Sequence, residues 1–172
     1  KGGWRLPVNY FSYVISGCLW VLFFFAWRKK YDCIIGHEPS PIFQAYPALL
    51  LRKLRKIPFY YWIMDLWPDA MKSGGGVKNE KLLNFIDKLV KGIYRQTDKI
   101  LITSKRFRES IAQKGDFKDK IIYFPNWSDD IQSMSQDYEI PKLPDGFKIM
   151  VAGYMGKAQN LEAISEVMIG LK

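Results

Sequence analysis

The sequence contains little cysteine and almost no histidine. Among its 172 residues, Cys18 and Cys33 are the only cysteines and His37 is the only histidine. The two cysteines form no C-x-x-C pair, which argues against a disulfide framework and against a cysteine-built zinc site. One histidine cannot form a multi-histidine metal site, and any Ser-His-Asp triad would have to include it. We therefore expect neither of these metal sites nor such a triad, and we expect a reducing compartment. No cofactor is predicted for this chain.

Negative charge is also scarce. The chain has 26 Lys and Arg against 17 Asp and Glu, a net charge of +9, which favours an anionic partner such as phosphate, lipid headgroups, nucleic acid or an acidic sugar. Hydrophobic residues make up 48% of the chain and charged residues 25%, so the composition excludes intrinsic disorder. The length predicts one domain, or one domain with a piece of another.

The segment from Tyr10 to Trp27 has no charged residue and is followed directly by Arg28, Lys29 and Lys30. It is close to the ~20 apolar residues that a membrane span requires. Three interpretations follow, namely a buried core helix, which is favoured, a helix lying in the membrane interface, or a true span. In both membrane interpretations, the basic end favours the cytoplasmic side.

Strand-like runs alternate with helical periods in the rest of the chain. Strands are predicted at 31–36, 59–64, 98–103, 119–124 and 147–152, and helices at 42–56, 80–96, 104–113 and 161–170. This order predicts the α/β class, with a Rossmann-like parallel sheet and helices on both faces. The acidic, proline-containing stretch 128–146 is typical of a linker between two domains.

Ligands of parallel sheets bind beyond the carboxyl ends of the strands, so the turns there are the candidate sites. Asp65 and Asp69 follow a strongly apolar strand. Carboxylates in this position can hydrogen-bond sugar hydroxyls or act as a base, or they can simply cap the turn and a short helix. Four positions on one turn do not establish the spacing of a glycosidase pair, so hydrolysis is not favoured.

Two further turns contain candidate residues. Gly153 and Gly156 precede a helix with Lys157 beside them, so their amides can form an anion site for a diphosphate, although a plain tight turn fits as well. The turn from His37 to Pro41 offers Ser40 to a ligand. Nucleic-acid binding is not favoured, because the aromatic residues fall mostly in apolar runs that are predicted to be buried.

Five segments stand in a fixed order along most of the chain. They are Tyr31-Asp32-Cys33-Ile34-Ile35 with Ser40-Pro41, Met64-Asp65-Leu66-Trp67-Pro68-Asp69, Thr97 to Ser104, Pro125-Asn126-Trp127, and Val151 to Glu162. Together they resemble the group 1 (family 4) glycosyltransferases of the GT-B fold, in particular the bacterial branch that builds surface polysaccharides and lipid-linked saccharides. The chain departs from many relatives at Met64, where they carry His, and at Tyr154, where they carry Arg.

The resemblance implies a partial GT-B fold. Residues 1–127 would be an acceptor-binding Rossmann-like domain without its first strand-helix unit, 128–146 the linker, and 147–172 the start of a truncated donor-binding domain. The implied site residues are Asp65 as the catalytic residue, Gly153, Gly156, Lys157 and Asn126 for the donor, and Glu38, Ser40 and Asp69 for the acceptor.

The resemblance further implies retaining transfer of a sugar from a nucleotide-diphosphate-sugar to a lipid-diphosphate-linked or saccharide acceptor, without a metal. The basic charge and the apolar Tyr10–Trp27 segment suit an anionic membrane surface at the cytoplasmic, inner face of the cell membrane. We expect this piece to be inactive by itself. The alternative is a non-catalytic, membrane-surface binding domain with the same Rossmann-like layout.

Overall fold

The structure is a computed structural model that describes residues 4–28, 30–73, 77–127, 142–143, 145–148, 150, 152–153 and 161–170. The chain divides into two units, Lys1–Asn126 and Trp127–Lys172. The first unit contains a four-stranded, all-parallel sheet with the strand order β1-β2-β3-β4, connected by helices. This arrangement confirms the α/β class and the Rossmann-like parallel sheet.

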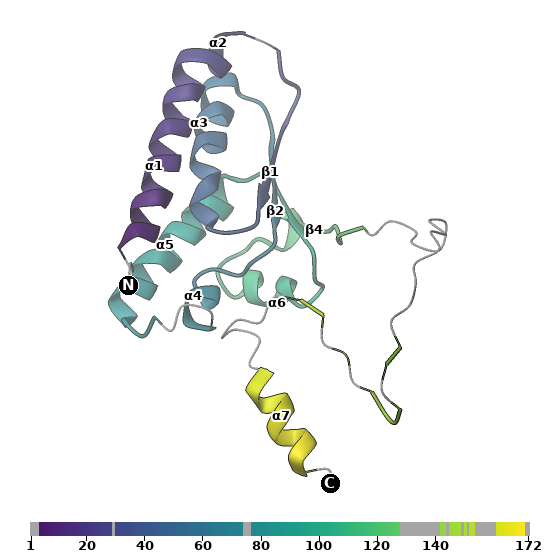
Figure 1. Cartoon of the computed structure of the whole chain (residues 1–172). Coiled ribbons are helices and arrows are strands. Elements are labelled where there is room, and N and C mark those ends of the chain that lie inside the picture. Colours follow the sequence, from purple (N-terminus) through teal and green to yellow (C-terminus); the bar gives the residue numbers. More distant parts are fainter. Residues whose placement is uncertain are drawn as a thin grey trace. The chain divides into compact units, whose positions relative to one another are not determined.

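The described elements follow the predicted alternation of strands and helices (Figure 1). The first unit contains α1 (Arg5–Trp20), the π-helical η1 (Val21–Phe25), α2 (Ala26–Arg28), β1 (Ile34–Glu38), η2 (Ile42–Gln44), α3 (Ala45–Arg55), β2 (Phe59–Ile63), α4 (Asp69–Ser73), α5 (Glu80–Gln96), β3 (Lys99–Ile102), α6 (Phe107–Ala112), η3 (Lys118–Lys120) and β4 (Ile121–Tyr123). The second unit contains α7 (Leu161–Gly170).

Helix α5 shows how local sequence signals set an element's bounds. The side chain of Asn79 accepts a hydrogen bond from the backbone N–H of Leu82 at 3.1 Å, which satisfies one of the free amides at the start of the helix. The stripe of apolar residues that begins at Leu83 is buried. Both the helix predicted over 80–96 and its cap are confirmed.

The predicted strand bounds differ from the structure, most of all for the first and the last strand. The strand predicted over 119–124 is shorter, Ile121–Tyr123, because Lys118–Lys120 form η3. The first strand begins at Ile34 and ends at Glu38 rather than covering 31–36, because its residues pair in parallel with Phe59–Ile63. The strand expected over 147–152 is not seen at its described residues 147, 148, 150 and 152. Phe147 and Met150 are exposed there, and the described residues of this range pair with no described strand, although a strand needs a partner to be stable.

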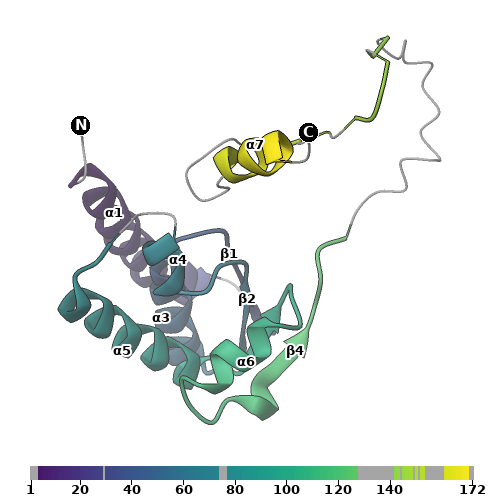
Figure 2. The same ribbon diagram turned by 90° about the horizontal axis from the view of Figure 1, so that it is seen from below.

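Alternate residues of the central strands are buried on one face of the sheet. Phe59, Tyr61 and Ile63 of β2 are almost completely inaccessible to solvent, as are Ile100 and Ile102 of β3. Figure 2 shows α3 and α5 on the same side of β1 and β2. The helical side chains in this core are Ile42, Ala45, Leu49, Ile86, Val90, Ile93, Tyr94 and Ile111.

The opposite face of the sheet is apolar but only half-covered. His37, Trp62 and Leu101 are aligned across β1, β2 and β3, and the rings of His37 and Trp62 lie 5.0 Å apart. Ile35, on the same face, is 65% exposed. The core of the described first unit therefore lies on the side of the sheet that α3, α5 and α6 cover.

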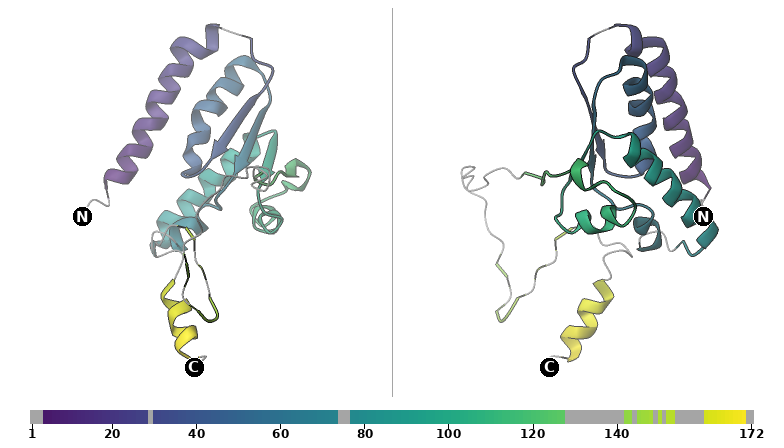
Figure 3. Two further views of the ribbon diagram at one scale, coloured as in Figure 1. Left: turned by 45° about the vertical axis from the view of Figure 1, so that its right-hand side comes forward. Right: turned by 180° about the vertical axis from the view of Figure 1, so that it is seen from behind.

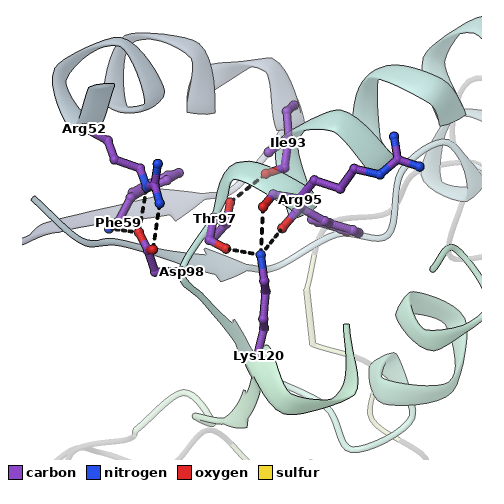
Figure 4. A network of polar contacts seen from close by, with 8 residues as sticks. Arg52, Phe59, Ile93, Arg95, Thr97, Asp98 and Lys120 are labelled. Carbon is purple, nitrogen blue, oxygen red and sulfur yellow. Dashed lines mark hydrogen bonds and ion pairs between the residues drawn. The ribbon is translucent and has the colours of Figure 1, made fainter. Parts of the chain in front are cut away.

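A polar network fixes the amino-terminal edge of the sheet (Figure 4). Arg52 of α3 donates two hydrogen bonds of 2.7 Å to the carboxylate of Asp98, which also accepts the backbone N–H of Phe59 at 2.8 Å. Lys120 donates to the carbonyl oxygens of Arg95 and Thr97 at 2.7 and 2.8 Å, where α5 ends. The basic residue Arg52 thus has a tertiary partner in addition to its place at a helix end.

The apolar amino-terminal helix is the main departure from the sequence interpretation. Pro7–Phe25 is long and apolar enough to cross a membrane by length and composition, yet only 6% of this window is buried in the structure. Helix α1 lies along the outer side of α3 (Figures 1 and 3). Its interpretation as a buried core helix is therefore wrong for the described residues, and this segment leaves a large apolar surface exposed.

Replacing Asp98 should weaken the amino-terminal edge. The hydrogen bonds from Arg52 lower the pKa of Asp98 to about 2, so its contribution to stability is present above the unfolded-state pKa of 3.8 and is lost as the pH falls toward 2. Because the pair is about one-third exposed, we expect Asp98→Asn to lower the free energy of unfolding at pH 7 by only about 1–2 kcal/mol.

Urea unfolding at pH 7 and pH 3 measures this effect, and exposed Asp116 provides the control substitution Asp116→Asn. The difference in unfolding free energy between the Asp98→Asn variant and the wild type should be smaller at pH 3 than at pH 7. Equal stability of the Asp98 and Asp116 variants at pH 7 would contradict a structural role for the network.

Candidate functional site

The four parallel strands run in one direction and end at a common edge of the sheet. The turns after them begin at Pro39, Met64, Thr103 and Phe124. Figure 2 looks onto this edge from below, with α4 beside it. Five predicted site residues follow or end these strands, so the fold places them at the same edge, namely Glu38, Ser40, Asp65, Asp69 and Asn126.

Glu38 joins the ends of β1 and β2. Its side chain is completely buried, and Oε2 accepts the backbone N–H groups of Met64 and Asp65 at 3.2 and 3.1 Å. The Met64 amide also lies 3.2 Å from the carbonyl oxygen of Glu38. One buried carboxyl group therefore fixes the backbone from which the Asp65 side chain projects.

Burial changes the protonation of this carboxyl group. Removal from water raises the pKa of Glu38 to about 8, although the hydrogen bonds from the Asp65 and Met64 amides act in the opposite direction. At neutral pH the group is therefore mostly protonated. Oε2 accepts both amides, whereas Oε1 is buried without a hydrogen-bond partner among the described residues.

Aromatic side chains are part of the core beneath this edge, and Tyr61 and Tyr94 lie near enough to Glu38 for its charge to act on them. Trp67 is 5% exposed and makes an edge contact with Phe43 at 5.6 Å between ring centroids. Tyr61 donates its hydroxyl proton to the carbonyl oxygen of Ile42 at 2.8 Å. Burial raises the pKa of Tyr94, and the charge of Glu38 acts in the same direction.

Asp65 is half-buried at the carboxyl end of β2. Burial raises the pKa of its side chain above the ordinary value of 3.8. A carboxylate in this partly desolvated position can accept hydrogen bonds from hydroxyl groups of a ligand or take up a proton. The geometry therefore permits the catalytic or substrate-orienting role that the sequence predicts for Asp65, and that role stays a prediction.

The other residues at this edge differ in exposure. Ser40 is half-buried with φ of 126°, a backbone conformation that is rare for a residue with a Cβ atom, and its carbonyl oxygen accepts the side-chain amide of Gln44 at 2.8 Å. Asp69 begins α4 and forms an exposed ion pair with Lys72 at 3.6 Å. Asn126 is exposed after β4, two strands away from β2, or roughly 10 Å by strand spacing.

The predicted donor turn belongs to the second unit. Gly153 is exposed, and its φ of 143° lies in a region that L-residues with side chains rarely adopt. Gly156 and Lys157 lie outside the described residues. The donor-binding prediction for this turn therefore remains a prediction.

The grouping of metal-ligand residue types and one cavity both bear on this edge. In the described part of the chain, no group of three or more His, Cys, Asp or Glu side chains could hold a metal ion. A cavity of about 520 Å³ lies between the end of α4 and the start of α5, and its lining contains no predicted site residue. The residues that line this cavity are Lys72, Val77, Lys78, Glu80, Leu83 and Asn84.

Comparison with known proteins gives a distant relative. A curated protein of Escherichia coli (strain K12), provisionally named a colanic acid biosynthesis glycosyl transferase, WcaI, is 28% identical over 153 residues. The match covers 81% of this chain and 37% of the relative. No protein-family model matches the chain, and no solved structure matches it.

The chain is therefore distantly related to a glycosyltransferase, and it matches about 37% of that relative's length. The fold agrees with this relationship, because an all-parallel sheet flanked by helices is a Rossmann-like arrangement.

The buried carboxyl group should make stability depend on pH. Because folding raises the pKa of Glu38 from 4.5 to about 8, its contribution is most favourable below pH 4.5 and is lost as the pH rises through 8. We expect the Glu38-dependent part of the unfolding free energy to fall between pH 5 and pH 8, by at most about 1.4 kcal/mol per pH unit.

Chemical denaturation at pH 5, 6.5 and 8 tests this expectation. The unfolding free energy of Glu38→Gln should depend less on pH than that of the wild type. The unfolding free energy of Glu109→Gln, a substitution on the exposed surface of α6, should show the wild-type pH dependence. Parallel pH profiles for the wild type and Glu38→Gln would show that Glu38 is ionised in the folded chain.

Proposed function

We propose that this chain is part of a retaining glycosyltransferase that moves a sugar from a nucleotide-diphosphate-sugar to a lipid-linked or polysaccharide acceptor at the cytoplasmic face of the membrane. The main support is the edge at which Glu38 holds the Asp65 turn in place. The distant relationship to a glycosyltransferase supports the same reaction class.

The chemistry of sugar transfer assigns a role to each turn. The bond between the anomeric carbon and the diphosphate breaks while the oxygen of the acceptor hydroxyl bonds to that carbon, so negative charge builds on the departing diphosphate, which takes up the hydroxyl proton. Backbone amides at Gly153 and Gly156, with the ammonium group of Lys157, would stabilise that charge. Asn126 would contact the donor, and Asp65 would orient the sugar or acceptor hydroxyls. Such a design requires no metal ion.

We propose different roles for the three residues that the sequence predicts to contact the acceptor. Ser40 and Asp69 lie beside the Asp65 turn, and Asp69 is exposed, so both suit direct contact with a saccharide. Glu38 is fully buried and bonded to the amides of that turn. We therefore assign to Glu38 a positioning role, in which it acts on a substrate through Asp65.

A non-catalytic membrane-surface domain is the second candidate. The exposed apolar Pro7–Phe25 segment and the net charge of +9 favour membrane binding whether or not the chain takes part in catalysis. Vesicle binding does not separate the two candidates, because both would bind. Turnover of a nucleotide-sugar separates them, because only the enzyme consumes the donor.

Asp65→Asn provides the test of the enzymatic proposal. The substitution preserves the shape of the side chain and removes its charge, so we expect the turnover of the natural full-length protein to fall by about 100-fold or more. The assay follows release of nucleoside diphosphate from a panel of nucleotide-sugars in the presence of a lipid-linked saccharide.

Asp116→Asn, at an exposed position before η3, serves as the matched control and should retain wild-type turnover. Wild-type turnover by the Asp65→Asn variant would remove Asp65 from the mechanism. Failure of the unmodified protein to consume any donor would favour the non-catalytic candidate.

A further inference from the structure

One side of the amino-terminal helix presents a continuous apolar surface to solvent. We call this the outward face, and its residues are 48–73% exposed. Their spacing of three or four positions puts them on one side of the helix. The outward face consists of Trp4, Val8, Phe11, Ile15, Leu19 and Phe23. An exposed apolar surface of this length is unusual for a water-soluble protein and indicates an interaction site.

The opposite side of the same helix packs against α3. Gly17 lies so close to Pro47 that a Cβ atom added there would be 2.7 Å from Cγ of the proline. Val21 is 5% exposed, and the carbonyl oxygen of Ala26 accepts a hydrogen bond from Arg55 at 2.8 Å. Contacts at the middle and at the end of the segment therefore hold it lengthwise along α3 (Figure 3).

This lengthwise packing is incompatible with a membrane span. Hydrocarbon surrounding α1 on all sides would also enclose α3, which carries the exposed Lys53 and Lys56 and the ion pair of Arg52 with Asp98. Charged side chains and the open edge of a sheet are not stable in the bilayer core. Contact through the outward face lets the helix meet lipid while α3 stays outside the hydrocarbon.

The polar groups of the helix do not oppose such contact. The hydroxyl of Ser12 donates to the carbonyl oxygen of Asn9 at 2.9 Å, and that of Ser16 to the carbonyl oxygen of Tyr13 at 3.2 Å. Both serines therefore satisfy their donors within the helix. A hydroxyl that is bonded in this way is transferred from water at lower cost than a free one.

The charges near the helix favour an anionic surface. No Asp or Glu precedes Asp32, whereas Arg28, Lys29 and Lys30 follow the apolar segment. Lys53 and Lys56 are exposed at the end of α3, the end at which Arg55 contacts α2. Pairing of two copies through this helix would bring only basic residues of the segment together, which argues against a second copy as the occupant.

We propose that the outward face of α1 and η1 lies in the interfacial region of an anionic lipid bilayer, parallel to the membrane surface, with Lys53 and Lys56 at the headgroups. Helices with an apolar side and basic residues bind membranes in this orientation. The inference does not depend on glycosyl transfer, because it concerns only the surface of the first unit. Of the three interpretations that the sequence allows for this segment, the proposal is the helix that lies in the membrane interface, rather than the buried core helix or the membrane span.

Flotation of the full chain with lipid vesicles tests the proposal. We expect binding to vesicles of three parts phosphatidylcholine and one part phosphatidylglycerol, and at least tenfold weaker binding when Leu19→Glu and Phe23→Glu are combined. The matched control is Ile35→Glu, because Ile35 is 65% exposed on the sheet, away from the helix. Circular dichroism verifies that each variant is folded.

The charge contribution has its own comparison. Lys53→Gln with Lys56→Gln should reduce binding to the anionic vesicles several-fold, and should change binding to pure phosphatidylcholine much less. Lys81→Gln with Lys88→Gln, at exposed positions of α5, removes the same charge elsewhere and should have a smaller effect. Equal effects of the two pairs would contradict the assigned headgroup contact.

Three results would overturn the proposal. Retention of the chain in vesicles after an alkaline carbonate wash would indicate a span, because interfacial proteins are extracted. A monomer that binds neither vesicle type would exclude the membrane. A dimer that dissociates in the Leu19 and Phe23 double variant would identify a second copy as the occupant. None of these results changes the donor-turnover test of the enzymatic proposal.

Discussion

The common direction of the four strands is the constraint on which the rest of the structure depends. Parallel strands place all their carboxyl ends at one edge, so turns that are far apart in sequence become neighbours. This arrangement lets the Glu38 side chain reach the amides of Met64 and Asp65. The opposite edge is fixed separately, by the bonds of Asp98 to Arg52 and to the amide of Phe59.

A fully buried carboxyl group next to a candidate catalytic residue is costly for folding. Burial raises the pKa of Glu38 to about 8, which means that its ionised form is disfavoured in the folded chain. An apolar residue would avoid this cost but could not accept two backbone amides. Functional sites commonly retain such unfavourable groups when they hold a reactive side chain in place, and the position of Asp65 fits that pattern.

The first unit combines a well-packed interior with large apolar surfaces. The core on the α3 and α5 side of the sheet is continuous, whereas the outward face of α1 and the side of the sheet with Ile35 and Trp62 are much less covered. The apolar residues that stabilise the fold are therefore different from the apolar residues that are exposed and available for an interaction. The π-helical η1, which continues α1, shows this division most clearly, since Val21 is buried and Phe23 is exposed.

The sequence alone determined the class of fold, the helix over 80–96 with its Asn79 cap, and the turn containing Asp65, because these depend on local periodicity and capping. It could not decide that β1 extends to Glu38, since strand ends depend on pairing with β2. The burial of Glu38 and the exposure of the apolar helix were decided by the tertiary structure. Composition shows how apolar a segment is, but only the packing of the folded chain shows which side of the segment is buried.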